Sequence, residues 1–301
     1  MKLFSPDNAH WYRRNGEAMH SVLSAKGEPR PTRLGDARKL GLLPSVTNIL
    51  GVVAKPDLVD WKMEQAVLAS LTLPRREGES LDAFARRAVE DSKGGGRSAA
   101  QFGTAFHAGA VLVAKSIEVD PAGPCAAWLD HYRAWFQANC LRLVWTEQVL
   151  VNAEAGYAGT ADLLMEHRAY GLTLVDLKTQ QVKGPGGRPP KARAYPSWGY
   201  QLAAYRRAIG EKVACMNLIV NSVEPGPPIE HLWSQEELER AWKVFEAAQV
   251  IWRTEKGYDP REKPKAEIEK AEGPGGRAPG EGIADRPSPI ANECAAAVAG
   301  I

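Results

Sequence analysis

Hydrophobic and polar residues follow two different patterns along the chain, the first typical of helices and the second of strands. Residues 1–43 show neither pattern, and the turn signals Asn15-Gly16 and Lys26-Gly27 predict an irregular or hairpin-like start. Helical segments then follow, with Ser80 and Ser98 placed as N-caps. We expect four helices, at residues 57–71, 80–91, 98–115 and 124–139, with the glycines at 94–96 breaking the chain between the second and the third.

From residue 143 the pattern changes to the alternation of β-strands. Residues 143–151 alternate and are rich in β-branched side chains, and residues 157–166 and 172–179 predict two further strands joined by a short turn at 168–170. The remaining expected elements are a loop rich in Gly, Pro and basic residues at 182–196, a helix at 198–209, strands at 213–221 and 229–233, and a helix to about residue 256 opened by the capping box Ser234-x-x-Glu237. This order predicts an α/β core.

The composition changes again near the end of the chain. The last 45 residues, 257–301, hold 7 Gly and 6 Pro without periodicity, and we expect them to be disordered. The sequence therefore divides into an N-terminal hairpin and helical elaboration at residues 1–97, an α/β core at 98–256 and a disordered C-terminal tail.

The overall composition excludes several classes of protein. With 38 basic and 36 acidic residues the net charge is +2, so the chain is not a histone-like polycation. The N-terminal residues show no apolar stretch, so we expect no signal peptide, and apolar runs such as residues 108–114 fall short of the ~18 residues that a membrane helix needs. Four widely spaced cysteines without a C-x-x-C pair argue against a zinc ribbon, a disulfide framework and an iron–sulfur cluster. We expect a cytoplasmic protein with free thiols and no membrane contact.

A pair of acidic residues on two neighbouring predicted strands is the most informative feature. Asp162 ends the segment Gly159-Thr-Ala-Asp162, and Asp176 lies in Val175-Asp176-Leu-Lys178. A hairpin centred on Ala169 pairs residues whose numbers sum to 338, and 162 + 176 gives that sum. The two carboxylates therefore face each other with Cβ atoms about 5 Å apart. Lys178, two residues beyond Asp176, points to the same face.

The surroundings of Asp176 favour a metal site. Leu172 and Leu174 on one face and Val175 and Leu177 on the other predict a central strand that is covered on both sides. Two carboxylates close together in a partly dry place repel each other and invite a divalent cation, and hard oxygen ligands suit Mg²⁺ or Mn²⁺. The alternative is an ordinary ion pair between Asp176 and Lys178, with Asp162 capping a turn.

Three further positions could belong to the same site. Gln201 and Tyr205 lie four residues apart, on one face of a predicted helix, although a half-buried amphipathic helix would show the same pattern. His107 lies in the helical half of the chain, where a single histidine is more often structural. Glu147 lies on the first core strand, where it is by default a solvated residue.

Positive charge is concentrated between the acidic pair and the end of the predicted Gln201 helix. Residues 178–212 hold eight basic residues and one acid, Glu211, so this segment carries +7 and the rest of the chain −5. A basic segment next to a metal site is what a rim for DNA phosphates requires, although such a segment can also be a solvated face. The residues that we expect to contact DNA are Lys183, Arg188, Lys191, Arg193 and Arg206.

The order of these motifs resembles that of the PD-(D/E)xK nuclease superfamily, in its RecB-like exonuclease branch. The matching pieces, in chain order, are His107, Gly159-x-x-Asp162, Asp176-x-Lys178 and Gln201-x-x-x-Tyr205. Upstream, Pro44-Ser-Val-Thr-Asn-Ile-Leu50 and Lys55-Pro-x-Leu-x-x-Trp61 are similar to the N-terminal signature of phage-encoded members and of the mitochondrial genome maintenance exonuclease. The resemblance covers residues 43–252.

The resemblance implies a fold and a role for each matching residue. The fold is a restriction-endonuclease-like core, a mixed central sheet flanked by helices. Asp162, Asp176 and the carbonyl of Leu177 would bind Mg²⁺ or Mn²⁺, with His107 supporting the metal. Lys178 would orient the attacking water and counter charge on the phosphate. The roles expected of the remaining residues are support of Lys178 or contact with DNA for Gln201 and Tyr205, and an auxiliary role for Glu147.

The activity that follows is metal-dependent hydrolysis of DNA phosphodiester bonds, because a divalent metal activates water and neutralises charge on the phosphate. We expect an exonuclease that acts on DNA ends or single strands, in DNA end processing, recombination or repair, and needs no iron–sulfur cluster. The alternatives are a structure-specific or restriction-type endonuclease on the same core, and a catalytically silent DNA-binding module. A purely structural interaction protein would leave the opposed carboxylates unexplained. The oligomeric state is left open.

Overall fold

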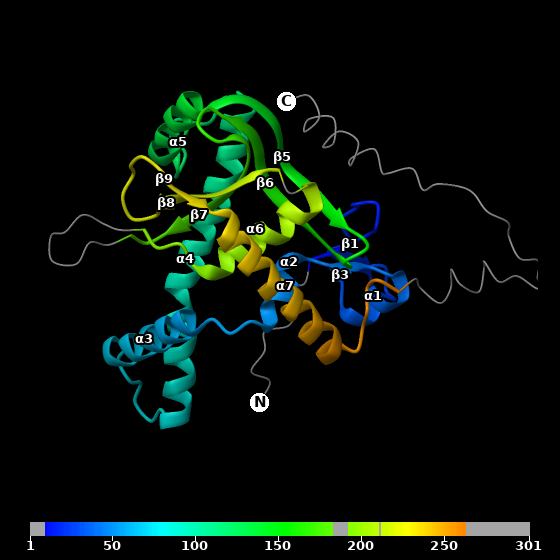
Figure 1. Cartoon of the computed structure of the whole chain (residues 1–301). Coiled ribbons are helices and arrows are strands. Elements are labelled where there is room, and N and C mark those ends of the chain that lie inside the picture. Colours follow the sequence, from blue (N-terminus) through cyan, green and yellow to red (C-terminus); the bar gives the residue numbers. More distant parts are fainter. Residues whose placement is uncertain (1–9, 183–191, 211, 263–301) are drawn as a thin grey trace, which may run out of the picture.

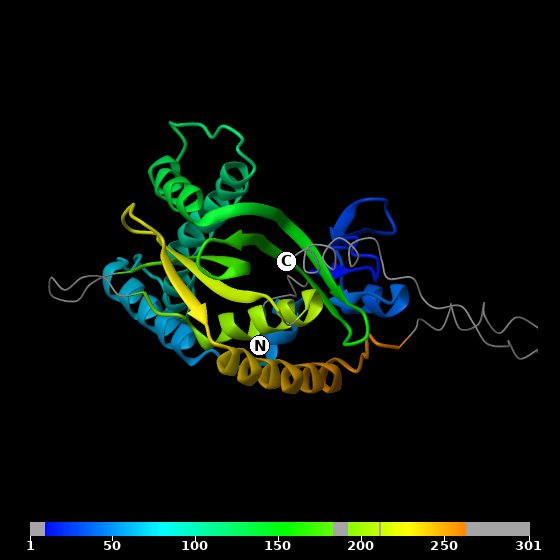
Figure 2. The ribbon, with the colours of Figure 1, turned by 45° about the horizontal axis from the view of Figure 1, so that its top comes forward.

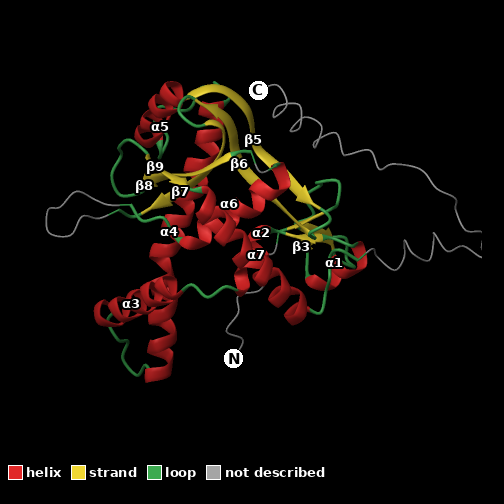
Figure 3. Cartoon of the chain, in the orientation of Figure 1, coloured by secondary structure: helices red, strands yellow, loops and turns green. Residues whose placement is uncertain are grey.

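The computed structural model of the chain describes residues 10–182, 192–210 and 212–262 (Figure 1). Its helices and strands are distinguished in Figure 3. In chain order the elements are β1 (Trp11–Tyr12), β2 (Ser21–Leu23), β3 (Pro29–Pro31), α1 (Leu34–Leu40), β4 (Leu43–Pro44), α2 (Val46–Ile49), the 3₁₀ helix η1 (Leu50–Val52), α3 (Pro56–Thr72), α4 (Leu81–Ala114), α5 (Ala126–Asn139), β5 (Cys140–Asn152), β6 (Tyr157–His167), β7 (Gly171–Gln180), α6 (Pro196–Ile209), β8 (Ala214–Asn221), β9 (Ile229–Trp233) and α7 (Gln235–Lys256).

A five-stranded mixed sheet forms the centre of the molecule. Its strand order is β5-β6-β7-β8-β9, with β7 and β8 parallel and every other neighbouring pair antiparallel. A parallel pair needs a long crossover, and α6 provides it between β7 and β8. β7 is therefore a central strand, as its apolar sequence predicts, and six of its residues in a row are buried.

Helices cover both faces of this sheet (Figure 2). Side chains of α6 and α7, such as Leu202 and Phe245, pack with Leu164 and Leu174 on one face. The other face packs against α4 and α5, as the group of Phe106, Leu129, Tyr132, Leu163 and Val175 illustrates. The alternation of Leu174 and Val175 between the two groups follows from the period of two in a strand. The mixed α/β architecture expected from the sequence is confirmed at this level.

In the second half of the chain, two features that depend on local sequence match the predictions. The turn after β6 gives the expected register, in which Leu163 pairs with Val175 and His167 with Gly171. The capping box of α7 is present, because Ser234 accepts from the Glu237 N–H and the Glu237 side chain accepts from the Ser234 N–H. Both predictions depend on residues close together in the chain, where local geometry dominates.

The expected break at the three glycines is wrong. Ser80 caps α4 as expected, but the helix then continues through residues 94–96 to Ala114. Glycine weakens a helix interior by about 1 kcal/mol per residue relative to alanine, and packing can offset that loss. Here α3 lies against α4, and a Cβ on Gly96 would be 3.7 Å from the Trp61 ring. The expected domain boundary at residues 97/98 thus falls inside one helix, whose first half projects from the sheet with α3 (Figure 1).

The start of the chain is more structured than its sequence predicts. The expected hairpin is present as β2 and β3, but α1 follows it and β1 pairs with β4. Trp11 and Tyr12 of β1 are buried, Trp11 in the group of α7 and Tyr12 beside Leu43. Long-range packing of this kind has no signature in a local pattern.

The expected boundary of the disordered tail, at residue 257, is also wrong. Tyr258 donates its hydroxyl hydrogen bond to the Leu42 carbonyl at 2.8 Å, and its ring lies 6.4 Å from that of Trp11. Arg14 donates to the Pro260 carbonyl at 2.7 Å. Residues 257–262 are therefore part of the folded molecule. The rest of the expected tail, residues 263–301, lies outside the described residues.

Within the described ranges, no helix combines the length and the apolar character needed to cross a membrane. Cys125, Cys140 and Cys215 are free thiols, as expected, and Cys294 lies outside the described ranges.

Candidate active site

The two acidic residues meet where the β6–β7 ladder ends. Its last pair is Leu163 with Val175, so Asp162 and Asp176 occupy the next position of the same register. There the Asp162 side chain takes the place of a strand partner, because its Oδ2 accepts from the Leu177 N–H at 2.7 Å. Side chains from both helical layers lie near this position, because His107 of α4 is 3.7 Å from Asp162 and Gln201 of α6 accepts from Lys178 at 3.2 Å.

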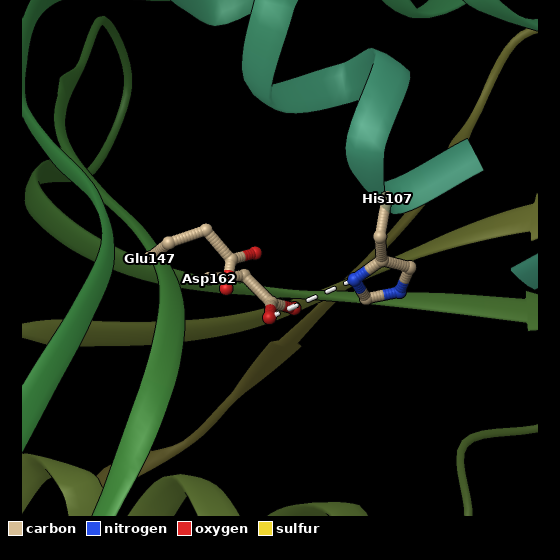
Figure 4. A group of neighbouring side chains, drawn as sticks. All are labelled: His107, Glu147 and Asp162. Carbon is tan, nitrogen blue, oxygen red and sulfur yellow. Dashed lines mark ion pairs between the residues drawn. The ribbon is translucent and has the colours of Figure 1, made fainter. Parts of the chain in front are cut away.

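His107, Glu147 and Asp162 form the first part of the site, which we call the His–Glu–Asp cluster. One potential ligand atom of each residue lies within 4.8 Å of those of the other two, and His107 Nδ1 is 3.7 Å from Asp162 Oδ1. Figure 4 shows that the three side chains converge from different elements, α4, β5 and β6. One imidazole and two carboxylates form a donor set that fits a divalent cation.

Glu147 enters this cluster through an unusual backbone conformation. The β5–β6 register pairs Thr146 with Leu163 and Gln148 with Ala161, and passes over Glu147 and Asp162 between them. Glu147 has φ 50°, in the left-handed region that costs a non-glycine residue about 1 to 2 kcal/mol. Partial desolvation raises the pKa of its carboxyl, opposed by the charges of His107 and Lys115. Strain of this kind is concentrated at functional sites.

Asp176 forms the second part of the site and is only 3% exposed. Lys178 Nζ lies 2.7 Å from its Oδ2 and 3.0 Å from its Oδ1, and Asn217 Nδ2 donates to Oδ2 at 2.6 Å. Burial raises the pKa of Asp176 to about 6, against the opposing charge of Lys178 and with that of Asp162. The pKa of Asp162 is also raised by burial. Each carboxylate therefore favours a cation or a proton nearby.

A line of hydrogen bonds leads from Lys178 to α6. Lys178 Nζ donates to Gln201 Oε1 at 3.2 Å, and Gln201 Nε2 donates to the Tyr205 hydroxyl at 3.4 Å. Burial raises the pKa of Tyr205, which keeps that hydroxyl protonated. A Cβ on Gly159 would lie 2.8 Å from the Tyr205 ring, so the glycine of Gly159-x-x-Asp162 provides room for Tyr205.

The structure thus brings together most of the expected site residues, in an arrangement that the sequence did not specify. Glu147, expected to be auxiliary, lies with His107 and Asp162, whereas Asp176 is bonded to Lys178. The ion pair that we considered as an alternative is therefore present beside the cluster. Asn217 is the residue that sequence analysis missed. Its signal was an amide in the middle of the apolar strand β8, flanked by Met216 and Leu218.

The expected DNA contacts have different outcomes. Arg193 is two-thirds exposed, with an ion pair to Asp57 at 3.2 Å. The assignment of Arg206 to DNA is wrong, because this side chain is 4% exposed and donates to the Val213 carbonyl, Gln235 and Glu239 inside the fold. The other three expected contacts, Lys183, Arg188 and Lys191, lie outside the described residues.

Comparisons with known proteins identify no family for this chain. No protein-family model matches the chain, and no curated protein matches it either. The chemistry of the site therefore follows from its own side chains.

Proposed function

We propose that this protein is a metal-dependent deoxyribonuclease, an exonuclease that hydrolyses phosphodiester bonds at DNA ends or in single strands. One observation carries the proposal: the His–Glu–Asp cluster lies beside the ion pair of the buried Asp176 with Lys178, at the end of one strand ladder. A cation site next to a fixed ammonium group matches the two charges that phosphodiester hydrolysis needs. The mixed sheet between helical layers supports a restriction-endonuclease-like core of the PD-(D/E)xK superfamily, RecB-like branch.

The donor set fits Mg²⁺ or Mn²⁺. His107, Asp162 and Asp176 would hold the ion with the Leu177 carbonyl, and the position of Glu147 adds it to this set. The raised pKa values of Asp162 and Asp176 support the fit, because burial disfavours two neighbouring negative charges even with Lys178 beside Asp176, and a bound cation would offset that cost. A bound divalent ion supplies a water of lowered pKa and neutralises charge on the phosphate.

The protein's own side chains supply orientation and a second positive charge. Lys178 has three N–H donors, and its contacts with Asp176 and Gln201 hold the ammonium group in one place. A fixed ammonium group stabilises charge that develops on the phosphate better than a mobile one, because no reorganisation is needed during the reaction. Gln201 thus acts on the reaction through Lys178, and Tyr205 acts through Gln201.

The positive charge of exposed side chains in the basic segment supports DNA as the partner. Arg193 lies exposed at the described end of the basic segment, close to Tyr195 and at 5.5 Å from its ring centroid. Exposed arginine and lysine side chains bind the DNA backbone without reading sequence. Such an enzyme would serve DNA end processing, recombination or repair.

A catalytically silent DNA-binding module is the second candidate, and the Asp176–Lys178 ion pair favours it. That pair is complete without a metal, so it is compatible with a purely structural role. Such a module has no use for the strained backbone of Glu147 or for three cation ligands that converge.

The decisive experiment compares DNA topologies. The purified protein is incubated with end-labelled linear DNA and with closed circular DNA, in Mg²⁺ or in EDTA, beside an Asp162→Asn control. We expect Mg²⁺-dependent loss of linear DNA alone, and no cleavage by the control. Cutting of circles would indicate an endonuclease instead, and binding without cleavage would establish the silent module.

A further inference from the structure

A buried amide on the neighbouring strand contacts the proposed metal ligand. Asn217 is fully buried on β8 and stands beside Asp176 in the parallel β7–β8 ladder. Its Nδ2 donates to Asp176 Oδ2 at 2.6 Å, and its Oδ1 accepts from Trp233 Nε1 at 2.7 Å. Asn217 therefore joins an indole on β9 to the carboxylate on β7.

The chemistry of the indole determines which way this amide points. The ring nitrogen of Trp233 can only donate, so the Asn217 atom that faces it must be the carbonyl oxygen. The NH₂ group must then face Asp176, where the carboxylate needs a donor. If Trp233 could not donate, the Asn217 carbonyl oxygen would lose its partner, and the bond to Asp176 would have to hold the amide in place without it.

The position of Trp233 is itself determined by α6. A Cβ on Gly199 would lie 2.8 Å from the Trp233 ring, so the ring occupies space that only a glycine leaves open. Gln201, two residues further along the same helix, binds Lys178. The helix α6 therefore holds the Asp176–Lys178 pair from two sides, through Trp233 and Asn217 on one and through Gln201 on the other.

We infer that Asn217 and Trp233 are positioning residues that set the orientation of the Asp176 carboxylate toward the cation. This inference rests on the metal site of the proposed function. Asn217 is a neutral donor, so it restricts rotation of the carboxylate without neutralising its charge. Lys178 touches both oxygens and so does not distinguish them, whereas Asn217 donates to the side-chain oxygen Oδ2 alone.

The test removes the indole donor and keeps an aromatic ring. Trp233→Phe should weaken Mn²⁺ binding, measured by titration calorimetry, by about 10-fold to 100-fold, as expected when a group that orients a metal ligand is lost. The kcat for DNA should fall while KM for DNA stays unchanged. Asn217→Leu, which is similar in size and removes the donor without adding a charge, should weaken Mn²⁺ binding at least as much, and it provides the test if Trp233→Phe does not fold.

A second tryptophan–asparagine pair offers a matched control. Trp252 is also buried and donates to Asn48 Oδ1 at 3.3 Å, away from Asp176. Trp252→Phe should leave Mn²⁺ affinity unchanged even where it lowers the melting temperature. An equal loss of affinity in both tryptophan variants would overturn the inference, because general loosening would then explain it.

The outcomes separate this inference from the proposed function. Mn²⁺ affinity that is equal in the wild type and in Trp233→Phe overturns the positioning role, whatever happens to DNA. A wild type that binds Mn²⁺ but cleaves no DNA refutes the nuclease, and weaker binding by Trp233→Phe then still supports the positioning role. A wild type that binds no Mn²⁺ overturns both.

Discussion

Asp176 is a buried carboxylate on which opposing effects act. Burial and the charge of Asp162 favour its neutral form, whereas Lys178 favours the charged form. We expect Asp176→Asn to abolish cleavage, because the isosteric amide provides no negative charge for the cation. In EDTA it should melt at or above the wild-type temperature, and Mg²⁺ should stabilise it much less. Thermal melts with and without Mg²⁺ measure both effects. A destabilised variant that still cleaves DNA would contradict the site.

The same carboxylate gives the metal-free protein a specific pH dependence. Burial raises the pKa of Asp176 from 3.8 to about 6, so the folded state holds the proton more tightly than the unfolded chain. This contribution to stability is complete below about pH 4 and is lost as the pH rises through about 6. In EDTA, the melting temperature of Asp176→Asn should therefore increase relative to that of the wild type as the pH rises across that range. A constant difference would contradict the raised pKa.

Glu147 combines a strained backbone with a charged ligand, and two substitutions separate these properties. Glu147→Gln keeps the strain and removes the charge, so Mn²⁺ affinity should fall while the melting temperature changes little. Glu147→Gly removes both, and glycine tolerates φ 50°. Its stability should exceed that of Glu147→Gln by about 1 kcal/mol. Titration calorimetry measures the Mn²⁺ affinity, and urea unfolding measures the free energy of unfolding. Equal Mn²⁺ affinity in the wild type and both variants would show that Glu147 is not part of the metal site.

At the scale of elements, α4 contains glycines with different surroundings. A Cβ on Gly94 would meet nothing within 4 Å, and one on Gly96 would make ordinary contact with Trp61. Gly94→Ala and Gly96→Ala should each raise the free energy of unfolding by about 0.5 to 1 kcal/mol. Gly109→Ala is the matched control on the same helix. It should destabilise the protein, because its Cβ would collide with the Leu129 side chain of α5. Chemical denaturation of the three variants measures their free energies of unfolding and tests whether only Gly109→Ala falls below the wild type.

At the scale of the whole molecule, the residues that follow α7 pack against the segment from Trp11 to Leu42. Tyr258 donates to the Ala37 and Leu42 carbonyls, and its ring packs against those of Trp11 and Trp252, which also contact each other. A chain that ends at Glu262 should keep the melting temperature and the specific activity of the full chain. One that ends at Gly257 should melt about 5 to 10 °C lower, since it loses a buried aromatic side chain. Equal melting of both truncated chains would contradict this packing.

The sequence by itself determined the features that depend on neighbours in the chain. A period of two and a short turn at Ala169 were enough to place Asp162 opposite Asp176 in the register that the ladder follows. Helical spacing similarly placed Gln201 and Tyr205 on one face of α6. In both cases fixed backbone geometry relates sequence distance to position in space.

Only the tertiary structure decided the contacts between distant segments. The cluster of His107 with Glu147 depends on where α4 crosses the sheet, and the backbone of Glu147 adopts its strained φ within that packing. Arg206 is a positively charged residue in the basic segment, which made it a candidate for DNA contact. It is nevertheless buried, because α7 provides hydrogen-bond partners for it. Asn217 contacts Asp176 because β8 lies parallel to β7, a pairing made 41 residues away along the chain. Such contacts carry no local period, since side chains far apart in sequence meet only when the layers pack.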